Sequence, residues 1–409
     1  MTQHQALTEA LFKIKTANGE LKAFAAVRDE ASAIGLARQL AGPLAGQLVA
    51  VKDIFDTADL PTSYGSPIYA GYQPATEAAL VAIVRSAGGL VIGKSVTTEF
   101  AYLHPAGTLN PAAPGCTPGG SSSGSAAAVA AGLVPLAIGS QTGGSTIRPA
   151  SYCGIVGFKP SFAVLPTAGM KCFSWSLDTV GLFARTVQEV SLFAQAVSGR
   201  RIVAQAARAP ADWVVGVPDA YPWGELSASA GQAMDRATAA LREAGARVVN
   251  CTLPSWARDA FVAHDTVQGW EAVRALRREM ETAADRLSPL LREYLTASTQ
   301  ISDEAYAKAQ AALARTRSEC AIWLPGIDVL LSPSAPDEPP TGYASTGAST
   351  FNRAWTLLGA PCVSVPGAVG VNGRPMGLQM TAPPGSDDVC LAAGAMLESV
   401  LKTNPKETP

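Results

Sequence analysis

Ser121 and Ser145 each follow a pair of glycines within the glycine- and serine-rich segment 119–150. A serine hydroxyl becomes an effective nucleophile when a neighbouring base takes its proton. The chain has only three histidines, so the base that most serine hydrolases use is scarce. Lys52 ends an apolar run that begins at Gln47, and burial in an apolar strand lowers the pKa of an amine. These residues predict nucleophilic catalysis by serine with a lysine as the base.

The glycine- and serine-rich segment is also compatible with a phosphate-binding loop or with a plain turn and helix cap. A Walker loop requires a lysine after its last glycine, and no lysine follows here. The G-x-G-x-x-G spacing of dinucleotide-binding loops does not match either. A tight turn and a helix N-cap explain one such triplet. Two triplets together with the upstream lysine favour a catalytic site.

The composition is that of a well-packed globular protein, with 48% hydrophobic and 16% charged residues. A net charge of −2 gives no general attraction to nucleic acid or to anionic membranes. The longest uncharged apolar stretch, 126–138, is too short to span a membrane and is broken by Gly132 and Pro135. The amino-terminal residues lack a signal-peptide pattern, so a cytoplasmic location is expected.

The cysteines and histidines give no sign of a disulfide framework or a metal site. The seven cysteines are scattered, odd in number and without C-x-x-C spacing, which fits small core residues. The three histidines have no metal-ligand spacing. We expect His104 and His264 to be hydrogen-bonded residues near the cleft or the surface. The expected chemistry therefore uses neither a metal nor a cofactor.

The alternation of strands and helices predicts one α/β domain. The more charged region 254–324 is expected to be a mainly helical insertion on the sheet. Helices are expected within 5–40 and at 77–88, 121–132 and 228–244. Strands are expected at 47–54, 90–93, 133–140, 214–217, 246–251, 329–331, 361–365 and 377–380.

With Lys52, Ser121 and Ser145 in this arrangement, nearly the whole chain resembles the amidase signature family. The resemblance implies one amidase signature domain over residues 1–409, with a central mixed β-sheet flanked by helices on both faces. By motif position it makes Lys52 the base, Ser121 the bridging serine and Ser145 the nucleophile. In that family the bridging serine follows a cis peptide bond, here Gly120–Ser121, so the resemblance implies a Ser-cisSer-Lys triad.

The ordinary pKa of a lysine side chain is about 10.4. For Lys52 to act as a base at neutral pH, its pKa must be well below that value. Neutral Lys52 takes a proton from Ser121, which takes one from Ser145 as it attacks the amide carbon. The backbone N–H groups of the loop that ends at Ser145 are expected to form the oxyanion hole. That loop consists of Thr142, Gly143, Gly144 and Ser145. Water then cleaves the acyl-enzyme.

Arg148 departs from the usual family pattern, because it lies three positions after Ser145 where most members carry arginine two positions after the nucleophile. In this respect the chain resembles the malonamidase branch, as it also does in the segments 152–154, 159–161 and 170–181. The resemblance implies that Arg148 binds a substrate carboxylate, for which an arginine fork is suited. It also implies that Ser332 assists in binding the same carboxylate. A structural role remains the alternative for both residues.

The leading expectation is an amidohydrolase that releases ammonia from small linear amides with a nearby carboxylate, such as malonamate. Two alternatives stay open: a hydrolase of biuret- or urea-derived carboxylic acids, and the glutaminase-type component of a tRNA-dependent amidotransferase. A non-enzymatic binding protein is disfavoured because Lys52, Ser121 and Ser145 are all present. The expected partner is the small-molecule amide, with no nucleic acid or membrane. A homodimer is expected only from its general frequency among soluble enzymes.

Overall fold

One 11-stranded mixed sheet runs through the computed structural model, which describes residues 3–200, 202 and 208–403. Its strand order is β1-β3-β2-β4-β6-β5-β10-β11-β9-β7-β8. Neighbours β3, β2 and β4 run parallel, as do β9, β7 and β8, whereas the pairs from β4 to β9 are antiparallel. The strands are β1 (Phe24–Val27), β2 (Leu48–Lys52), β3 (Leu90–Ser95), β4 (Leu136–Gln141), β5 (Val156–Lys159), β6 (Thr179–Ala184), β7 (Val214–Pro218), β8 (Arg247–Cys251), β9 (Val329–Pro333), β10 (Cys362–Val369) and β11 (Pro375–Thr381).

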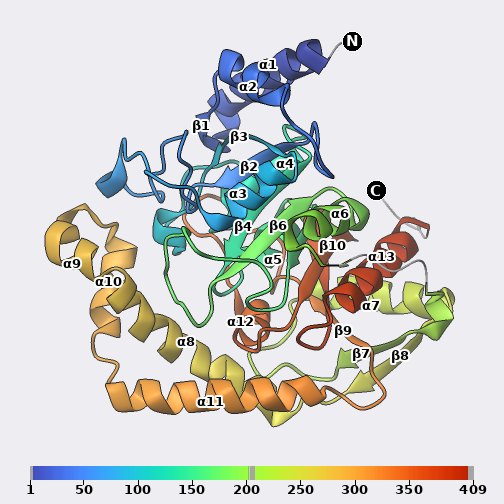
Figure 1. Cartoon of the computed structure of the whole chain (residues 1–409). Helices are drawn as coiled ribbons and strands as arrows, with labels where there is room; N and C mark the ends of the chain where they lie inside the picture. Colours follow the sequence, from blue (N-terminus) through green and yellow to red (C-terminus); the bar gives the residue numbers. More distant parts are fainter. Residues whose placement is uncertain (1–2, 201, 203–207, 404–409) are drawn as a thin grey trace.

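Helices cover both faces of this sheet (Figure 1). Helix α6 contacts α3 and α13, and α13 also contacts α7. Helices α4 and α5 contact each other, and they contact many of the same strands as those four helices. The helices are α1 (Gln3–Leu21), α2 (Glu30–Ala37), α3 (Ala79–Ser86), α4 (Ser123–Ala130), α5 (Ile147–Tyr152), α6 (Val187–Ser198), α7 (Ala228–Glu243), α8 (Ser255–Ala275), α9 (Arg277–Ala283), α10 (Pro289–Ser298), α11 (Asp303–Ile322), α12 (Thr350–Leu357) and α13 (Asp387–Thr403). Short 3-10 helices lie at Pro67–Tyr69, Glu99–Ala101, Pro210–Asp212 and Ala284–Arg286.

Side chains along each strand point alternately to the two faces of the sheet, so the hydrophobic core forms one layer on each face. In β2, Val49 and Val51 pack into the hydrophobic cluster that contains α3 and α6 side chains. Ala50, between them, packs into the cluster formed by α4 and the amino-terminal helices. Successive side chains of a strand point to opposite faces, so a continuous apolar run is the pattern of a strand covered on both sides. The expected α/β class with a central mixed sheet is confirmed.

Helices α8 to α11 follow β8 in the chain and precede β9, within the charged region where helices were expected. Helices α8 and α11 lie side by side, and α8 also contacts α12 (Figure 1). None of the helices in the described part of the chain combines the length and apolar character needed to cross a membrane.

Two helices, α1 and α2, occupy the region 5–40 where helices were expected, but strand β1 lies between them and was not expected. Strand β1 pairs antiparallel with β3 at the edge of the sheet. The Asn18 side chain accepts a hydrogen bond from the Phe24 N–H and donates one to its carbonyl, which holds the turn between α1 and β1. The pairing with β3 is a contact between distant segments, and such contacts override a local helical pattern.

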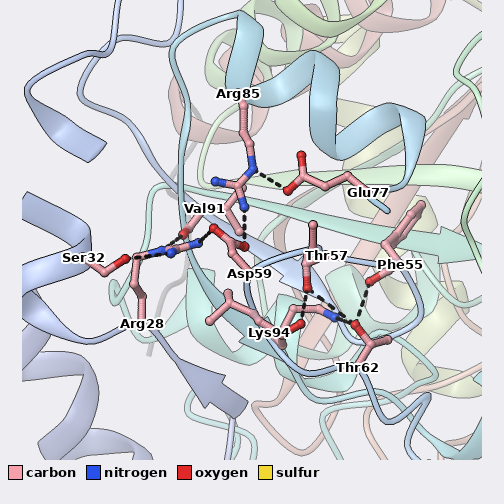
Figure 2. Close-up of polar contacts among 12 residues, drawn as sticks. Arg28, Ser32, Phe55, Thr57, Asp59, Thr62, Glu77, Arg85, Val91 and Lys94 are labelled. Atoms are coloured by element: carbon pink, nitrogen blue, oxygen red, sulfur yellow. Dashed lines mark hydrogen bonds and ion pairs between the residues drawn. The ribbon is translucent and has the colours of Figure 1, made fainter. Parts of the chain in front are cut away.

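An ion-pair network fastens this amino-terminal edge to the sheet, as Figure 2 shows. Asp59 lies between two arginines, with one carboxylate oxygen 2.6 Å from Arg28 and the other 2.7 Å from Arg85. Arg85 also pairs with Glu77 at 2.8 Å. The network joins the residue after β1, the segment after β2 and helix α3. It therefore holds the elements that surround β2, the strand that ends at Lys52.

Candidate active site

Lys52 lies in the protein interior between two serine hydroxyls. Its Nζ donates hydrogen bonds to the Oγ atoms of Ser121 and Ser140, each at 2.7 Å. Lys52 ends β2 and Ser140 lies near the end of β4, and these strands are parallel neighbours, so their carboxyl ends meet at one edge of the sheet. Ser121 reaches the same point from the turn before α4. Lys52 and Ser121 have no exposed surface, and Ser140 is also buried.

The backbone before α4 brings Ser121 to the lysine. The Gly120–Ser121 peptide bond is cis, and Gly119 has a φ of 81°, in the region that favours glycine. A Cβ on Gly119 would also lie 3.0 Å from Pro149 Cα, so a side chain here would press on the backbone of α5. Helix α4 consequently begins at Ser123, two residues later than the sequence pattern predicts.

The environment of Lys52 favours the neutral amine. Burial lowers the pKa of Lys52 well below its usual value, while the negative charge of Asp178 acts in the opposite direction. No ion pair involves Lys52 in the described part of the chain, whereas the neighbouring buried Lys94 pairs with Asp53 at 2.9 Å. The ion-pair partner of Asp53 is therefore Lys94. This agrees with the expectation that adjacent residues of an extended chain, here Lys52 and Asp53, point in opposite directions. A neutral amine between two hydroxyls has the properties of a general base.

The loop between β4 and α5 presents Ser145, and the side chain of Gln141 shapes this loop. The Gln141 carbonyl oxygen accepts hydrogen bonds from the N–H groups of Thr146, at 2.9 Å, and Ile147, at 3.1 Å. Its amide nitrogen donates to Thr356 on α12. A Cβ on Gly144 would lie 2.4 Å from the Asn352 side chain, so α12 packs directly against the loop. The loop is thus fixed from both sides.

Ser145 and the loop line a small cavity of about 70 Å³. Among the described residues, no backbone hydrogen bond uses the N–H groups of Gly143, Gly144 or Ser145 as donors. Unused N–H groups beside a serine hydroxyl are the donors that an oxyanion hole requires. The cavity is also lined by Tyr102, Phe173 and Tyr294, whose rings stack in a continuous wall.

The structure brings Lys52 and Ser121 together but leaves Ser145 without a side-chain hydrogen bond in the part of the chain that it describes. Ser145 keeps 8% of its surface exposed, toward the cavity, whereas Ser121 is fully buried. The arrangement therefore has a buried, hydrogen-bonded lysine and serine, Lys52 and Ser121, and a separate accessible hydroxyl on Ser145. Catalytic hydrogen bonds are often long in the ligand-free state and shorten when substrate binds.

Asp178 and His264 support the loop from the side of β6 and α8. The Thr142 hydroxyl donates to Asp178 at 2.6 Å, and Asp178 also accepts from the N–H groups of Phe173 and Ser174. The His264 Nε2 lies 2.8 Å from the Thr142 carbonyl, so this nitrogen carries the proton. His264 is buried and His104 is exposed. Burial raises the pKa of Asp178, although its three hydrogen bonds lower it.

We expect Asp178→Asn to shift the acid limb of kcat/KM to lower pH. The charge of Asp178 raises the pKa of Lys52, so removing that charge lets the amine lose its proton at a lower pH. Asparagine can keep the hydrogen bonds, with its carbonyl toward Phe173 and Ser174 and its amide toward Thr142. The measurement is kcat/KM against pH for both proteins.

Asp387→Asn is the matched control, because Asp387 is also buried but lies at the start of α13. There its carboxylate accepts a hydrogen bond from the Ser161 N–H. Its acid limb should coincide with that of the wild type. An acid limb that moves to higher pH in Asp178→Asn contradicts the proposed electrostatic coupling.

Arg148 lines the cavity, but its terminal nitrogens are engaged by the backbone. Nη1 donates to the Gly347 carbonyl and Nη2 to the Gly120 carbonyl, both at 2.6 Å. Arg148 is 1% exposed, and burial lowers its pKa to about 10. Ser332, on β9, accepts a hydrogen bond from Gln379 and is not among the described residues that line the cavity.

Several residues around the site were not identified from the sequence. Ser140 and Gln141 lie within the glycine- and serine-rich segment, and their place before Thr142 was a usable signal. Asp178 lies within the segment 170–181, and the sequence assigned no role to this residue. Arg353 on α12 lines the cavity, and no local pattern marks it. Its position depends on how α12 packs against the loop that carries Ser145.

Comparison with known proteins identifies relatives along almost the entire chain. Residues 5–391 match the family model described as "Amidase". One component of the glutamyl-tRNA(Gln) amidotransferase of Halobacterium salinarum is 32% identical over 87% of this chain and 96% of the relative. The 2-amino-5-chloromuconic acid deaminase of Comamonas testosteroni is 31% identical over 88% of this chain and 82% of its own length.

Solved structures share the fold as well. A crystal structure described as an amidase has a TM-score of 0.87 and 30% identity, covering 98% of this chain and 96% of its own. A 6-aminohexanoate cyclic dimer hydrolase with bound substrate has a TM-score of 0.86 and 25% identity, covering 98% and 94%.

Proposed function

The chain belongs to the amidase family and is a hydrolase of amide C–N bonds, and from this we propose that it cleaves small linear amides with a nearby carboxylate through a Lys52, Ser121 and Ser145 triad. Malonamate is one such substrate. The observation that carries the proposal is the buried Lys52, which pairs with no carboxylate in the described residues and has its Nζ 2.7 Å from Ser121 Oγ. Resemblance to the malonamidase branch stays a prediction.

In the proposed reaction the proton moves along the triad while the acyl group moves to Ser145. Neutral Lys52 accepts the Ser121 proton, and Ser121 accepts the Ser145 proton as Ser145 Oγ bonds to the amide carbon. The resulting oxyanion accepts hydrogen bonds from the free N–H groups of the loop from Gly143 to Ser145. The proton returns through Ser121 to the leaving nitrogen, the C–N bond breaks, and ammonia departs. Water then hydrolyses the acyl-enzyme by the same proton path.

Two observations support a small acidic substrate. The cavity of about 70 Å³ admits only a small group. Its charged lining residues, among those described, are Arg148, Arg353 and Asp265, which leaves an excess of one positive charge. The Comamonas relative is named for an acidic substrate, 2-amino-5-chloromuconic acid, which is consistent with this class.

The test is ammonia release by the purified protein from malonamate and from propionamide, its neutral counterpart of similar size. We expect kcat/KM for malonamate to exceed that for propionamide at least about tenfold, because a charged hydrogen bond contributes about 1.5–3 kcal/mol. Equal rates, or a preference for propionamide, contradict the acidic-substrate proposal but leave amide hydrolysis intact. A biuret-derived acid in the same assay tests that alternative directly.

A second candidate function is the glutaminase step of a tRNA-dependent amidotransferase. It is favoured by the relatives, since the Halobacterium protein is named as one component of such an enzyme. This candidate predicts that glutamine is the preferred amide and that its hydrolysis increases when charged tRNA and the other components are added. The leading proposal predicts that malonamate outperforms glutamine in the isolated chain and that partners have no effect.

A further inference from the structure

Arg353 lies at the cavity with one edge of its guanidinium unoccupied. Its Nη1 donates to both carboxylate oxygens of Asp265, at 2.8 and 2.9 Å, and its Nε donates to Ser349 at 3.1 Å. No hydrogen bond or ion pair uses its Nη2 in the described part of the chain. The side chain is 26% exposed. Two N–H groups of Nη2 are therefore available to an incoming acceptor.

Arg148 differs from Arg353 in this respect. Both of its terminal nitrogens already donate to backbone carbonyls, and its Nε is buried with no partner among the described residues. A carboxylate bound through both terminal nitrogens of Arg148 would compete with the carbonyl of Gly120, which is buried, and with that of Gly347, which is half-buried. Leaving buried carbonyls unpaired is unfavourable. Arg148 therefore fits a positioning role, because it holds the carbonyl of the residue that precedes Ser121.

The side chain of Arg353 runs beside the loop that carries the nucleophile. A Cβ on Gly143 would lie 3.9 Å from Arg353 Cγ and 3.5 Å from Ser349 Oγ. Asn352, the preceding residue, packs against Gly144 and donates to the Ser334 carbonyl. Helix α12 therefore holds the Arg353 charge at a fixed place relative to Ser145. Both residues line the same cavity.

We propose that Arg353 is the residue that binds the substrate carboxylate, through its free Nη2 edge, while Asp265 fixes the rest of the guanidinium. This inference rests on the proposed function. It makes Arg353, in place of Arg148, the residue that contacts the substrate carboxylate. The Asp265 carboxylate lies between Arg353 and His264, whose Nδ1 is 3.6 Å away. Among the described residues that line the cavity, Asp265 is one carboxylate for two arginines, so the lining carries one positive charge in excess.

The aromatic wall narrows the substrate class further. The Tyr102 and Tyr294 rings stack at 4.5 Å with an interplanar angle of 25°, and Phe173 continues the stack 5.6 Å from Tyr102. The three aromatic residues line the cavity together with Arg353. A short carbon chain or conjugated acid packs well against such a wall. The inferred substrate is a short ω-carboxy amide whose chain contacts the rings while its carboxylate reaches Arg353.

The test compares Arg353→Gln with the wild type on malonamate and on propionamide. The kcat/KM for malonamate should fall about tenfold to hundredfold more than that for propionamide, because only the acid loses a charge-assisted hydrogen bond. Arg353→Lys keeps the charge without the fork and should recover part of the preference. Arg148→Gln should reduce both rates by similar factors. Arg315→Gln, on the exposed face of α11 and paired with Asp259, is the matched control with no change.

Binding is measured separately from turnover by titrating malonamate into Ser145→Ala. The Kd should rise by a similar factor when Arg353→Gln is added to this background. Equal losses on both amides in Arg353→Gln, or an acid-selective loss in Arg148→Gln, overturn the assignment. An unaltered Kd overturns it as well. If the wild type hydrolyses neither amide, the proposed function fails, whereas Arg353-dependent binding of the acid in the titration still tests the carboxylate site.

Discussion

Ser145→Ala is expected to reduce kcat for amide hydrolysis by about a millionfold, the loss seen when the nucleophile of a serine hydrolase is removed. Of the two serines that were predicted to be catalytic, Ser145 is the one that lines the cavity. In the described part of the chain, the backbone N–H groups next to it donate no backbone hydrogen bond. Without it no acyl-enzyme forms, and the buried Ser121 has no access to substrate. The measurements are ammonia release and the mass of the acylated protein after quenching with malonamate.

Ser123→Ala is the matched control for this change. Ser123 begins α4 in the same serine-rich turn, is buried, and donates a hydrogen bond to Thr108. This variant should keep turnover and acylation. Acylation that persists in Ser145→Ala, with the modified peptide mapped to residue 121, would contradict the nucleophile assignment and would make Ser121 the attacking serine.

Lys52→Arg is expected to be inactive at every pH, because the guanidinium stays protonated and cannot accept a proton. Lys52→Met removes the base altogether and should also lose activity by several orders of magnitude. In the wild type, kcat/KM should increase with pH as the amine loses its proton, and decline as pH falls through the lowered pKa of Lys52. A pH profile of all three proteins checks this prediction.

The same lysine makes the free energy of unfolding depend on pH. The unfolded chain keeps the Lys52 proton up to about pH 10.4, whereas burial makes the folded chain release it at lower pH. Between those two values the unfolded state binds more protons, so folding stability rises with pH. The difference in unfolding free energy between wild type and Lys52→Met should therefore shift in favour of the wild type as pH increases toward 10.4.

Lys308→Met provides the control for this titration, because Lys308 is 76% exposed on α11 and pairs with Glu304. Its difference from the wild type should show no such slope. Denaturant unfolding at several pH values measures both slopes. A Lys52→Met difference that stays flat, or that shifts in favour of the variant as pH rises, rules out a neutral Lys52 in the folded state.

Much of the fold could be predicted because it depends on local patterns. The apolar run before Lys52 and the run that ends at Gln141 are strands covered on both faces, so their residue types identify them directly. Strand β1 was missed because its four residues become a strand only by pairing with β3, a segment far along the chain. The helix after Ser121 was placed too early because a turn with Gly119 at positive φ precedes it.

Residue types and their spacing were enough to identify the chemical components of the site. The scarcity of histidine, the two serines behind glycine pairs and the lysine at the end of an apolar run can all be read along the chain. An apolar run before the lysine indicates a buried strand, and burial alone predicts a lowered pKa. These features were sufficient to predict a serine nucleophile with a lysine base, and they identified the family to which the chain belongs.

The groups that surround those components became known only from the way that separate elements pack together. Asp178 acts on Lys52 through space, and Gln141 shapes the nucleophile loop by hydrogen bonds to α12 and α5. Arg148 is close to Ser145 in sequence, yet its terminal nitrogens donate to backbone carbonyls. The distant Arg353 lines the cavity, and its Nη2 has no hydrogen bond in the described part of the chain. Spacing along the chain sets which residues are neighbours in sequence. The direction and occupancy of a side chain's hydrogen-bonding groups are set by contacts between elements that are distant along the chain.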